Sequence, residues 1–115
     1  MTFKKNNQMK IAIPSNDGLM IKCGGCSSKA FLVATIDGNV VVSQELRWNL
    51  LSEMMTSPEG IYYNLLDCDL VLLNGNSCGL LRFLKSKNIE VKYTAELTIV
   101  SALANVLSPV LIEEN

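Results

Sequence analysis

The centre of the fold is predicted by the run Asp69-Leu70-Val71-Leu72-Leu73-Asn74. Four consecutive apolar residues between polar ends are typical of a central strand that is covered on both faces. The run continues into Gly75-Asn76-Ser77-Cys78-Gly79, which is rich in turn-forming residues. We therefore expect a buried strand that passes through a tight turn into a helix.

The chain beyond this turn predicts a helix, a strand and a second helix. Leu80, Leu81 and Leu84 form an apolar stripe, and the first helix should end near Asn88, which tolerates the left-handed conformation. Residues 89–93 form a short strand. The last helix is predicted to end at Ser108-Pro109, and its apolar residues are Leu97, Val100, Leu103, Ala104 and Leu107.

The chain before the central run predicts three more strands. Residues 9–14 form the first, which ends at Pro14, and Ser15-Asn16-Asp17-Gly18 then begins a long loop that reaches Lys29. Residues 30–36 and 39–46 form a hairpin through the turn Asp37-Gly38.

Residues 47–56 show mixed signals. Ser57-Pro58-Glu59 is a good helix start. The buried face of this helix is predicted to consist of Ile61, Tyr62, Leu65 and Leu66.

This order of elements predicts an α/β fold. Right-handed crossovers make the later strands parallel, and the early hairpin adds antiparallel strands at one edge. We expect a mixed five-stranded sheet of order 3-2-1-4-5, with helices on its faces. The predicted organisation is a flexible N-terminal segment at residues 1–8, a single α/β domain at 9–108 and a C-terminal tail at 109–115.

Composition narrows the classes of function. The 115 residues carry a formal net charge of −1, so no long-range field would attract the phosphates of a nucleic acid. The chain has no histidine, which removes the usual general base and the commonest metal ligand. We expect no secretory signal and no membrane span, and therefore a cytoplasmic protein whose four cysteines are reduced.

The candidate site lies in the loop Lys22-Cys23-Gly24-Gly25-Cys26-Ser27-Ser28-Lys29. The two glycines let the loop fold back, so that both thiols can point at one metal. In open α/β sheets ligands bind where the winding reverses, at the carboxyl ends of the strands. In the predicted order this point lies between strands 1 and 4. Cys78 follows strand 4 and becomes a third candidate ligand.

Other residues near this point have competing interpretations. Cys68 precedes strand 4, which places it roughly 20 Å from the site and excludes it. Cys78 could equally pack a tight turn. Asn74, Asn76 and Ser77 are turn formers first and ligand-contacting groups second, although backbone amides at the helix start could hold an anion. Cys23 and Cys26 could also be a loop pair without function, or less readily a redox couple, because no helix follows them to activate the first thiol.

The hypothesis that the protein is an enzyme finds little support in the sequence. Metal-dependent ribonuclease H chemistry needs several gathered carboxylates, yet Asp37 and Asp69 are predicted at separate places. A cysteine nucleophile lacks its histidine. No phosphate-loop or dinucleotide fingerprint is present. We therefore expect a protein that is not an enzyme.

The motifs, taken in order, resemble the dinitrogenase iron-molybdenum cofactor biosynthesis family. They span about residues 9–107 and comprise Met9-Lys10-Ile11-Ala12-Ile13-Pro14, Phe31 with Asp37-Gly38, Asp67-Cys68-Asp69-Leu70-Val71-Leu72 with the glycine-rich turn, Asn88-Ile89-Glu90-Val91, and the Ala102-Leu103 helix. The resemblance implies a three-layer ribonuclease H-like fold. It also implies a nitrogen fixation accessory role, in which iron-sulfur or molybdenum-iron-sulfur clusters are bound or carried.

One motif departs from that family. Its members usually carry a histidine-phenylalanine-glycine-arginine motif shortly before the position of Phe31, where this chain has the CxxC loop. Thiolates suit iron-sulfur clusters, zinc or cuprous copper.

We therefore expect a carrier for an iron-sulfur or iron-molybdenum type cluster, with donor and acceptor proteins as partners. Its expected metal ligands are Cys23, Cys26 and Cys78, and Gly24, Gly25, Asn76 and Ser77 contact the cofactor. The alternatives are a structural or partner-binding domain with zinc-bound or free thiols, and a dithiol redox protein.

Overall fold

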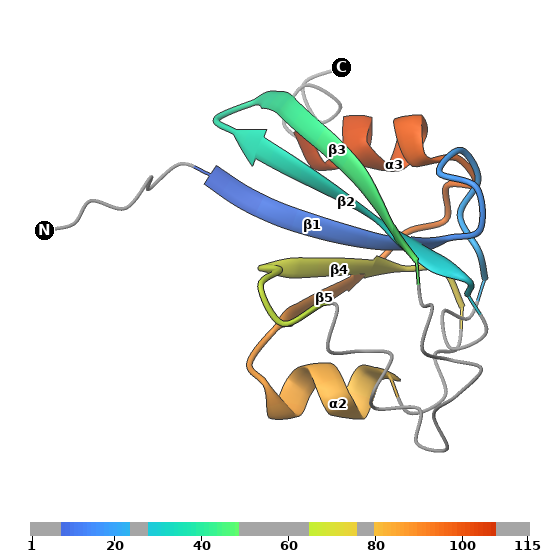
Figure 1. Cartoon of the computed structure of the whole chain (residues 1–115), viewed down its shortest axis with the longest axis vertical. Coiled ribbons are helices and arrows are strands. Elements are labelled where there is room, and N and C mark those ends of the chain that lie inside the picture. Colours follow the sequence, from blue (N-terminus) through green and yellow to red (C-terminus); the bar gives the residue numbers. More distant parts are fainter. Residues whose placement is uncertain (1–7, 24–27, 49–64, 76–79, 108–115) are drawn as a thin grey trace, which may run out of the picture.

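The computed structural model describes residues 8–23, 28–48, 65–75 and 80–107. Five strands and two helices lie in these ranges (Figure 1). In chain order they are β1 (Gln8–Ser15), β2 (Ala30–Asp37), β3 (Val40–Trp48), β4 (Leu70–Leu73), α2 (Leu80–Ser86), β5 (Glu90–Tyr93) and α3 (Ile99–Leu107).

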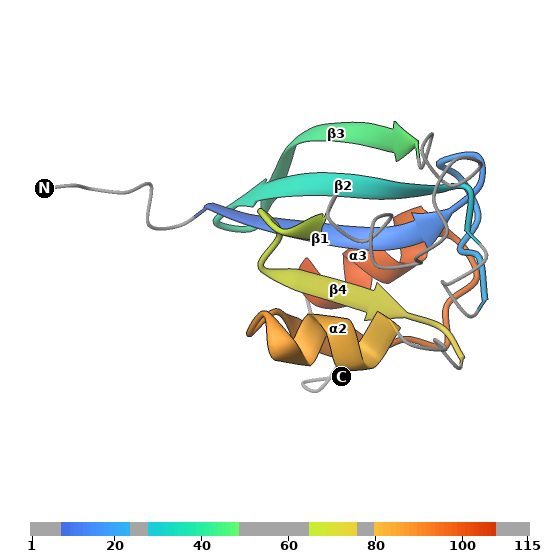
Figure 2. The same cartoon turned by 60° about the horizontal axis from the view of Figure 1, so that its bottom comes forward.

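The strands form one mixed sheet in the order β3-β2-β1-β4-β5, which confirms the predicted order. β1 pairs antiparallel with β2, and β2 pairs antiparallel with β3. β4 runs parallel to both β1 and β5. Figure 2 shows β3, β2, β1 and β4 as successive neighbours, with α2 beyond β4.

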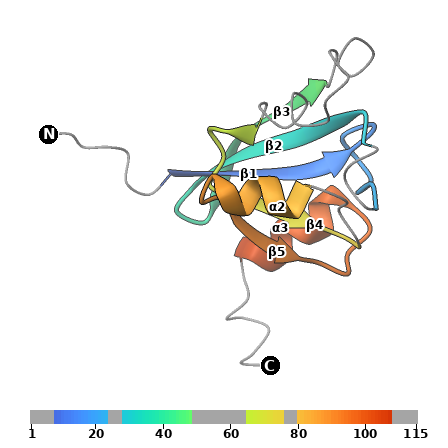
Figure 3. The ribbon, with the colours of Figure 1, turned by 90° about the horizontal axis from the view of Figure 1, so that it is seen from below.

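The two faces of the sheet are covered by different helices, so the protein has three layers (Figure 1). On β1, Ala12 belongs to the hydrophobic cluster that contains α2, whereas Ile11 and Ile13 belong to the cluster that contains α3. The four residues of β4 alternate in the same way and are all buried. Figure 3 shows α2 in front of the sheet. This double burial is the reason why β4 is apolar at every position.

Two turns form where the sequence predicts them. Gly38 has a φ of 67° in the β2–β3 hairpin, a conformation that glycine adopts without steric cost. Asn88 has a φ of 62° after α2, and the amide of Ile89 donates to the carbonyl of Leu84 at 2.9 Å. Asn88 therefore ends the helix as predicted.

The structure corrects the predicted end of β3. The strand continues through Arg47 and Trp48, which the mixed signals had left unassigned. Arg47 lies opposite Phe31 and so points to the α2 face of the sheet, where it donates hydrogen bonds to Asp67. A charged residue on a covered face does not fit the alternating pattern of a strand, which is why the prediction stopped early.

The apolar face predicted for the last helix is wrong in part. Leu97 and Val100 are 62% and 76% exposed, and Ala104 is exposed too. The helix begins only at Ile99, because the hydroxyl of Thr98 accepts the amide of Ser101 at 3.2 Å as an N-cap. Its buried stripe is therefore Ile99, Ala102 and Leu103.

The region before β4 is described only in part. Leu65 is fully buried as predicted, but Leu66 is 46% exposed and does not belong to the buried face. The helix predicted from Ser57, with Ile61 and Tyr62, lies outside the described residues.

Gln8 already pairs with Asp37, so β1 begins one residue inside the segment that was expected to be flexible. No helix among the described residues is long and apolar enough to cross a membrane.

Candidate functional site

The carboxyl ends of β1 and β4 lie together at one edge of the sheet. The two strands are parallel neighbours, with Ile11 opposite Leu70 and Ala12 opposite Val71. β1 is also the strand at which the winding reverses, because β2 and β3 lie on one side of it and β4 and β5 on the other. This is the switch point at which open α/β sheets bind ligands.

Cys23 lies at this switch point and contacts the segment that follows β4. Its exposed thiol donates a hydrogen bond to the side-chain oxygen of Asn74, with 3.3 Å between Sγ and Oδ1. The two residues are 51 positions apart in the sequence. The contact confirms the prediction that the loops after strands 1 and 4 converge.

The orientation of the Asn74 amide is fixed by a second partner. Its Nδ2 donates to the backbone carbonyl of Glu96 at 3.0 Å. Because a carbonyl oxygen only accepts, the amide nitrogen must face Glu96, and the amide oxygen must then face Cys23. Asn74 therefore links the loop that carries Cys23 to the segment after β5. Its amide oxygen is the acceptor for the thiol of Cys23.

The start of the loop that carries Cys23 is held by a compact set of turn contacts. The buried hydroxyl of Ser15 donates to the carbonyl of Met20 at 2.6 Å and accepts the amide of Gly18 at 2.8 Å. The carboxylate of Asp17 accepts the amides of Met20 and Leu19, and these hydrogen bonds lower the pKa of Asp17. Asp17 thus shapes the turn, while Ser15 anchors the loop to β1.

The loop is also tied to the segment before α3. The amide of Ile21 donates to the carbonyl of Leu97, and that of Ile99 donates to the carbonyl of Leu19, each at 2.9 Å. This short antiparallel bridge is centred on Met20 and Thr98. Residues from the loop after β1, the end of β4 and the segment after β5 therefore meet around Cys23.

Most of the predicted site residues lie outside the described part of the chain. These are Gly24, Gly25, Cys26, Asn76, Ser77 and Cys78. The three-thiol site therefore stays a prediction. Among the described residues, no group of three histidine, cysteine, aspartate or glutamate side chains is placed to hold a metal ion.

Cys68 lies apart from this edge. It precedes β4, whereas Asn74 follows the strand, and its side chain belongs to the α2-side core with only 5% exposure. Burial, together with the neighbouring charge of Asp67, raises the pKa of the Cys68 thiol to about 12. A buried, protonated thiol is a poor ligand and nucleophile, which agrees with its exclusion from the predicted site.

An ionic cluster near Cys68 was not foreseen from the sequence. Arg47 donates to both carboxylate oxygens of Asp67, at 2.7 and 3.0 Å, and Lys10 lies 3.2 Å from the same group. The hydrogen bonds from Arg47 are the main cause of the lowered pKa of Asp67. This cluster joins β3, β1 and the segment before β4, so it stabilises the packing of these three parts against one another.

Solved structures of several other proteins share this fold. A protein provisionally assigned as a dinitrogenase, from Methanocaldococcus jannaschii, matches with a TM-score of 0.66 and 20% identity over 89% of this chain and 90% of that one. The apo form of the orange protein from Desulfovibrio gigas matches with a TM-score of 0.66 and 19% identity over 88% of each chain. A provisionally assigned NifB protein from Thermotoga, placed in the DUF35 family, matches with a TM-score of 0.64 and 16% identity over 89% of each chain.

No protein-family model matches the chain, and no curated protein matches it. At identities of 16 to 20% the likeness to solved structures shows a common fold. The neighbours include proteins named for dinitrogenase and NifB, which bears out the resemblance at the level of the fold.

Proposed function

We propose that this protein is a non-enzymatic carrier of a metal cofactor, of the dinitrogenase iron-molybdenum cofactor biosynthesis type. The observation that carries the proposal is the contact between Asn74 and Cys23, the first residue of the CxxC motif, at the switch point of the sheet. The likeness to structures named for dinitrogenase and NifB supports the class of cargo.

In this proposal Cys23 and Cys26 are the first protein ligands, and Cys78 is a third. Thiolates are soft ligands, and an iron-sulfur or molybdenum-iron-sulfur cluster is the cargo that suits them. Three protein thiols leave part of the cluster open to other ligands. An exposed thiol such as Cys23 also lets a donor or acceptor protein approach, which suits transfer better than storage.

The acceptor oxygen of Asn74 contributes to loading and release. A thiol must lose its proton to bind a metal, and metal binding is therefore coupled to pH. The thiol of Cys23 donates a hydrogen bond to the side-chain oxygen of Asn74. We expect this hydrogen bond to break when a cluster binds to Cys23.

A second candidate function is a partner-binding domain whose thiols hold zinc or remain free. One observation favours it: the bridge next to Cys23 carries exposed apolar side chains. Exposed apolar residues that gather in one place often mark a protein-binding surface. In this structure they are Leu19, Met20, Leu97 and Val100.

Anaerobic purification, with metal analysis and an absorption spectrum, separates the two functions. Iron or molybdenum with visible absorption, lost in Cys23→Ser but kept in Cys68→Ala, would support the carrier. Stoichiometric, colourless zinc would support the partner-binding domain. A metal-free protein that also resists reconstitution would falsify the carrier proposal.

A further inference from the structure

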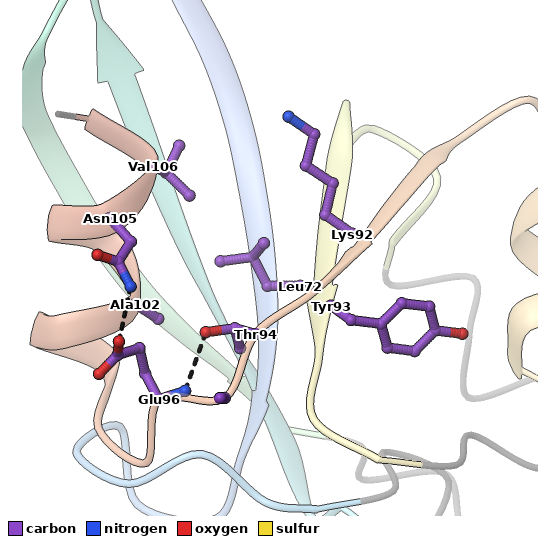
Figure 4. A pocket seen from close by; sticks show the side chains of 9 residues that line it. Leu72, Lys92, Tyr93, Thr94, Glu96, Ala102, Asn105 and Val106 are labelled. Atoms are coloured by element: carbon purple, nitrogen blue, oxygen red, sulfur yellow. Dashed lines mark hydrogen bonds between the residues drawn. The ribbon is translucent and has the colours of Figure 1, made fainter. Parts of the chain in front are cut away.

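A pocket of about 360 Å³ opens between β5 and α3 (Figure 4). Lys92 lies opposite Leu72 on neighbouring strands, so both side chains belong to the α3 face of the sheet. α3 packs on the central strands through Ile99, Ala102 and Leu103. Beside β5 the helix presents the small side chain of Ala102, which leaves the space next to Leu72 unfilled.

The floor of the pocket is apolar. It consists of Leu72, Ala102 and Val106, the first two of which are buried members of the α3-side core. The ring of Tyr93 turns away from Leu72 in Figure 4, so it offers no surface on which the nucleobase of a nucleotide could stack. Such a floor favours a ligand with an aliphatic body.

The two ends of the pocket carry opposite charges. Figure 4 shows the ammonium of Lys92 and the carboxylate of Glu96 on opposite sides of Leu72. Within the described residues, neither group forms an ion pair with the other or with a third residue. A ligand with one sign of charge would satisfy only one of them.

Glu96 is held in place from three directions. Its carboxylate accepts Nδ2 of Asn105 at 2.7 Å, and its amide donates to the hydroxyl of Thr94 at 3.1 Å. Its carbonyl accepts the side chain of Asn74 at 3.0 Å. The carboxylate is therefore positioned before any ligand binds, which lowers the ordering cost of binding.

The geometry points to a binding site for a short zwitterion with an aliphatic body, such as a dipeptide of apolar residues. Its ammonium would bind the carboxylate of Glu96, its carboxylate would bind the ammonium of Lys92, and its side chains would cover Leu72 and Val106. The site does not share a residue with the proposed metal ligands, so it stands whether or not the protein carries a cluster.

Methyl and amide NMR on the full chain tests this site with leucyl-leucine as the probe. We expect saturable shifts of the methyl groups of Leu72, Ala102 and Val106, with a dissociation constant on the order of 1 mM. The neutral analogue N-acetyl-leucyl-leucine amide has the same body without the charges, and it should bind far more weakly.

Matched substitutions locate the charges. Glu96→Gln keeps the acceptor for Asn105 and removes the charge, and Lys92→Met keeps the aliphatic stem. Each should weaken binding by about fivefold, the value of one hydrogen bond, whereas Lys85→Met on α2 should change nothing. Methyl groups that do not shift at millimolar peptide would overturn the inference. Equal binding of the neutral analogue, or unchanged affinity in both charge variants, would overturn it as well.

Discussion

Replacing Asp67 by asparagine removes the charge that joins β3, β1 and the segment before β4. Arg47 donates two hydrogen bonds to this carboxylate, and Lys10 lies 3.2 Å from it. The Asp67 side chain is half exposed, so solvent screens these interactions, but that of Arg47 is only 19% exposed. Exposed ion pairs contribute about 0.2 to 1 kcal/mol each. Because Arg47 forms a bidentate pair with Asp67 and Lys10 adds a further contact, we expect Asp67→Asn to lower the free energy of unfolding by about 1 to 2 kcal/mol.

The effect should depend on pH in a defined direction. Hydrogen bonds from Arg47 hold the pKa of Asp67 well below its ordinary value of 3.8, Lys10 adds to this, and partial burial acts against it. A lowered folded-state pKa contributes stability that is fully present above the unfolded value. That contribution is lost as the pH falls through the folded-state pKa. The difference between wild type and Asp67→Asn should therefore persist down to about pH 4 and shrink in stronger acid.

Urea unfolding at a series of pH values measures this difference. The unfolding slope should be the same in both proteins, so that the midpoints report stability directly. Asp37→Asn, at the exposed end of β2, is the matched control and should have little effect. A difference that stays constant into strong acid, or that equals the Asp37 control, would refute the role assigned to the cluster.

Three further predictions concern single side chains. Iodoacetamide at mildly alkaline pH should modify Cys23 in the folded protein and Cys68 only after unfolding, as mapped by mass spectrometry, because the pKa of Cys68 is raised to about 12; equal labelling of both would contradict the assigned burial. Asn88→Ala should cost about 1 kcal/mol in thermal or urea unfolding and Asn88→Gly should not, because position 88 has a φ of 62°. Equal losses in the two variants would argue against backbone conformation as the cause. Ser15→Ala removes a buried hydroxyl with a donor and an acceptor contact and should cost about 1 to 3 kcal/mol, whereas a change below the error of the melt would show that the turn does not need this anchor.

The strand order follows from signals that lie within short stretches of sequence. The unbroken apolar run at β4 indicated a strand covered on both sides, and Gly38 marked a hairpin. Chain connectivity and the handedness of crossovers then leave few arrangements. The structure has the predicted order because these local patterns and the global packing agree.

The errors arise where a specific side-chain contact overrides the spacing of apolar residues. Arg47 can lie in β3 on a covered face because Asp67, 20 positions away, pairs with it together with the neighbouring Glu45. The α3 stripe shifted because the cap at Thr98 sets where the helix begins, and Leu97 lies before it. The spacing of apolar residues does not by itself predict either contact.

The candidate site was predictable in position but not in detail. Topology brought Cys23 to the end of β4 and kept Cys68 away from it. The pairing of Cys23 with Asn74, and the link from Asn74 to Glu96, depend on side-chain geometry that has no sequence signature. The pocket beside β5 was missed because Lys92, Glu96 and Asn105 each look like ordinary surface residues.

The proposed function requires Cys23, at the switch point of the sheet, to hold a metal cofactor. Its most direct test is anaerobic reconstitution of wild type, Cys23→Ser and Cys68→Ala with iron and sulfide, followed by iron analysis and the visible spectrum of each desalted protein. We expect a coloured, iron-containing wild type, an equally loaded Cys68→Ala and a largely colourless Cys23→Ser. Equal iron and equal absorption in Cys23→Ser and wild type would contradict it.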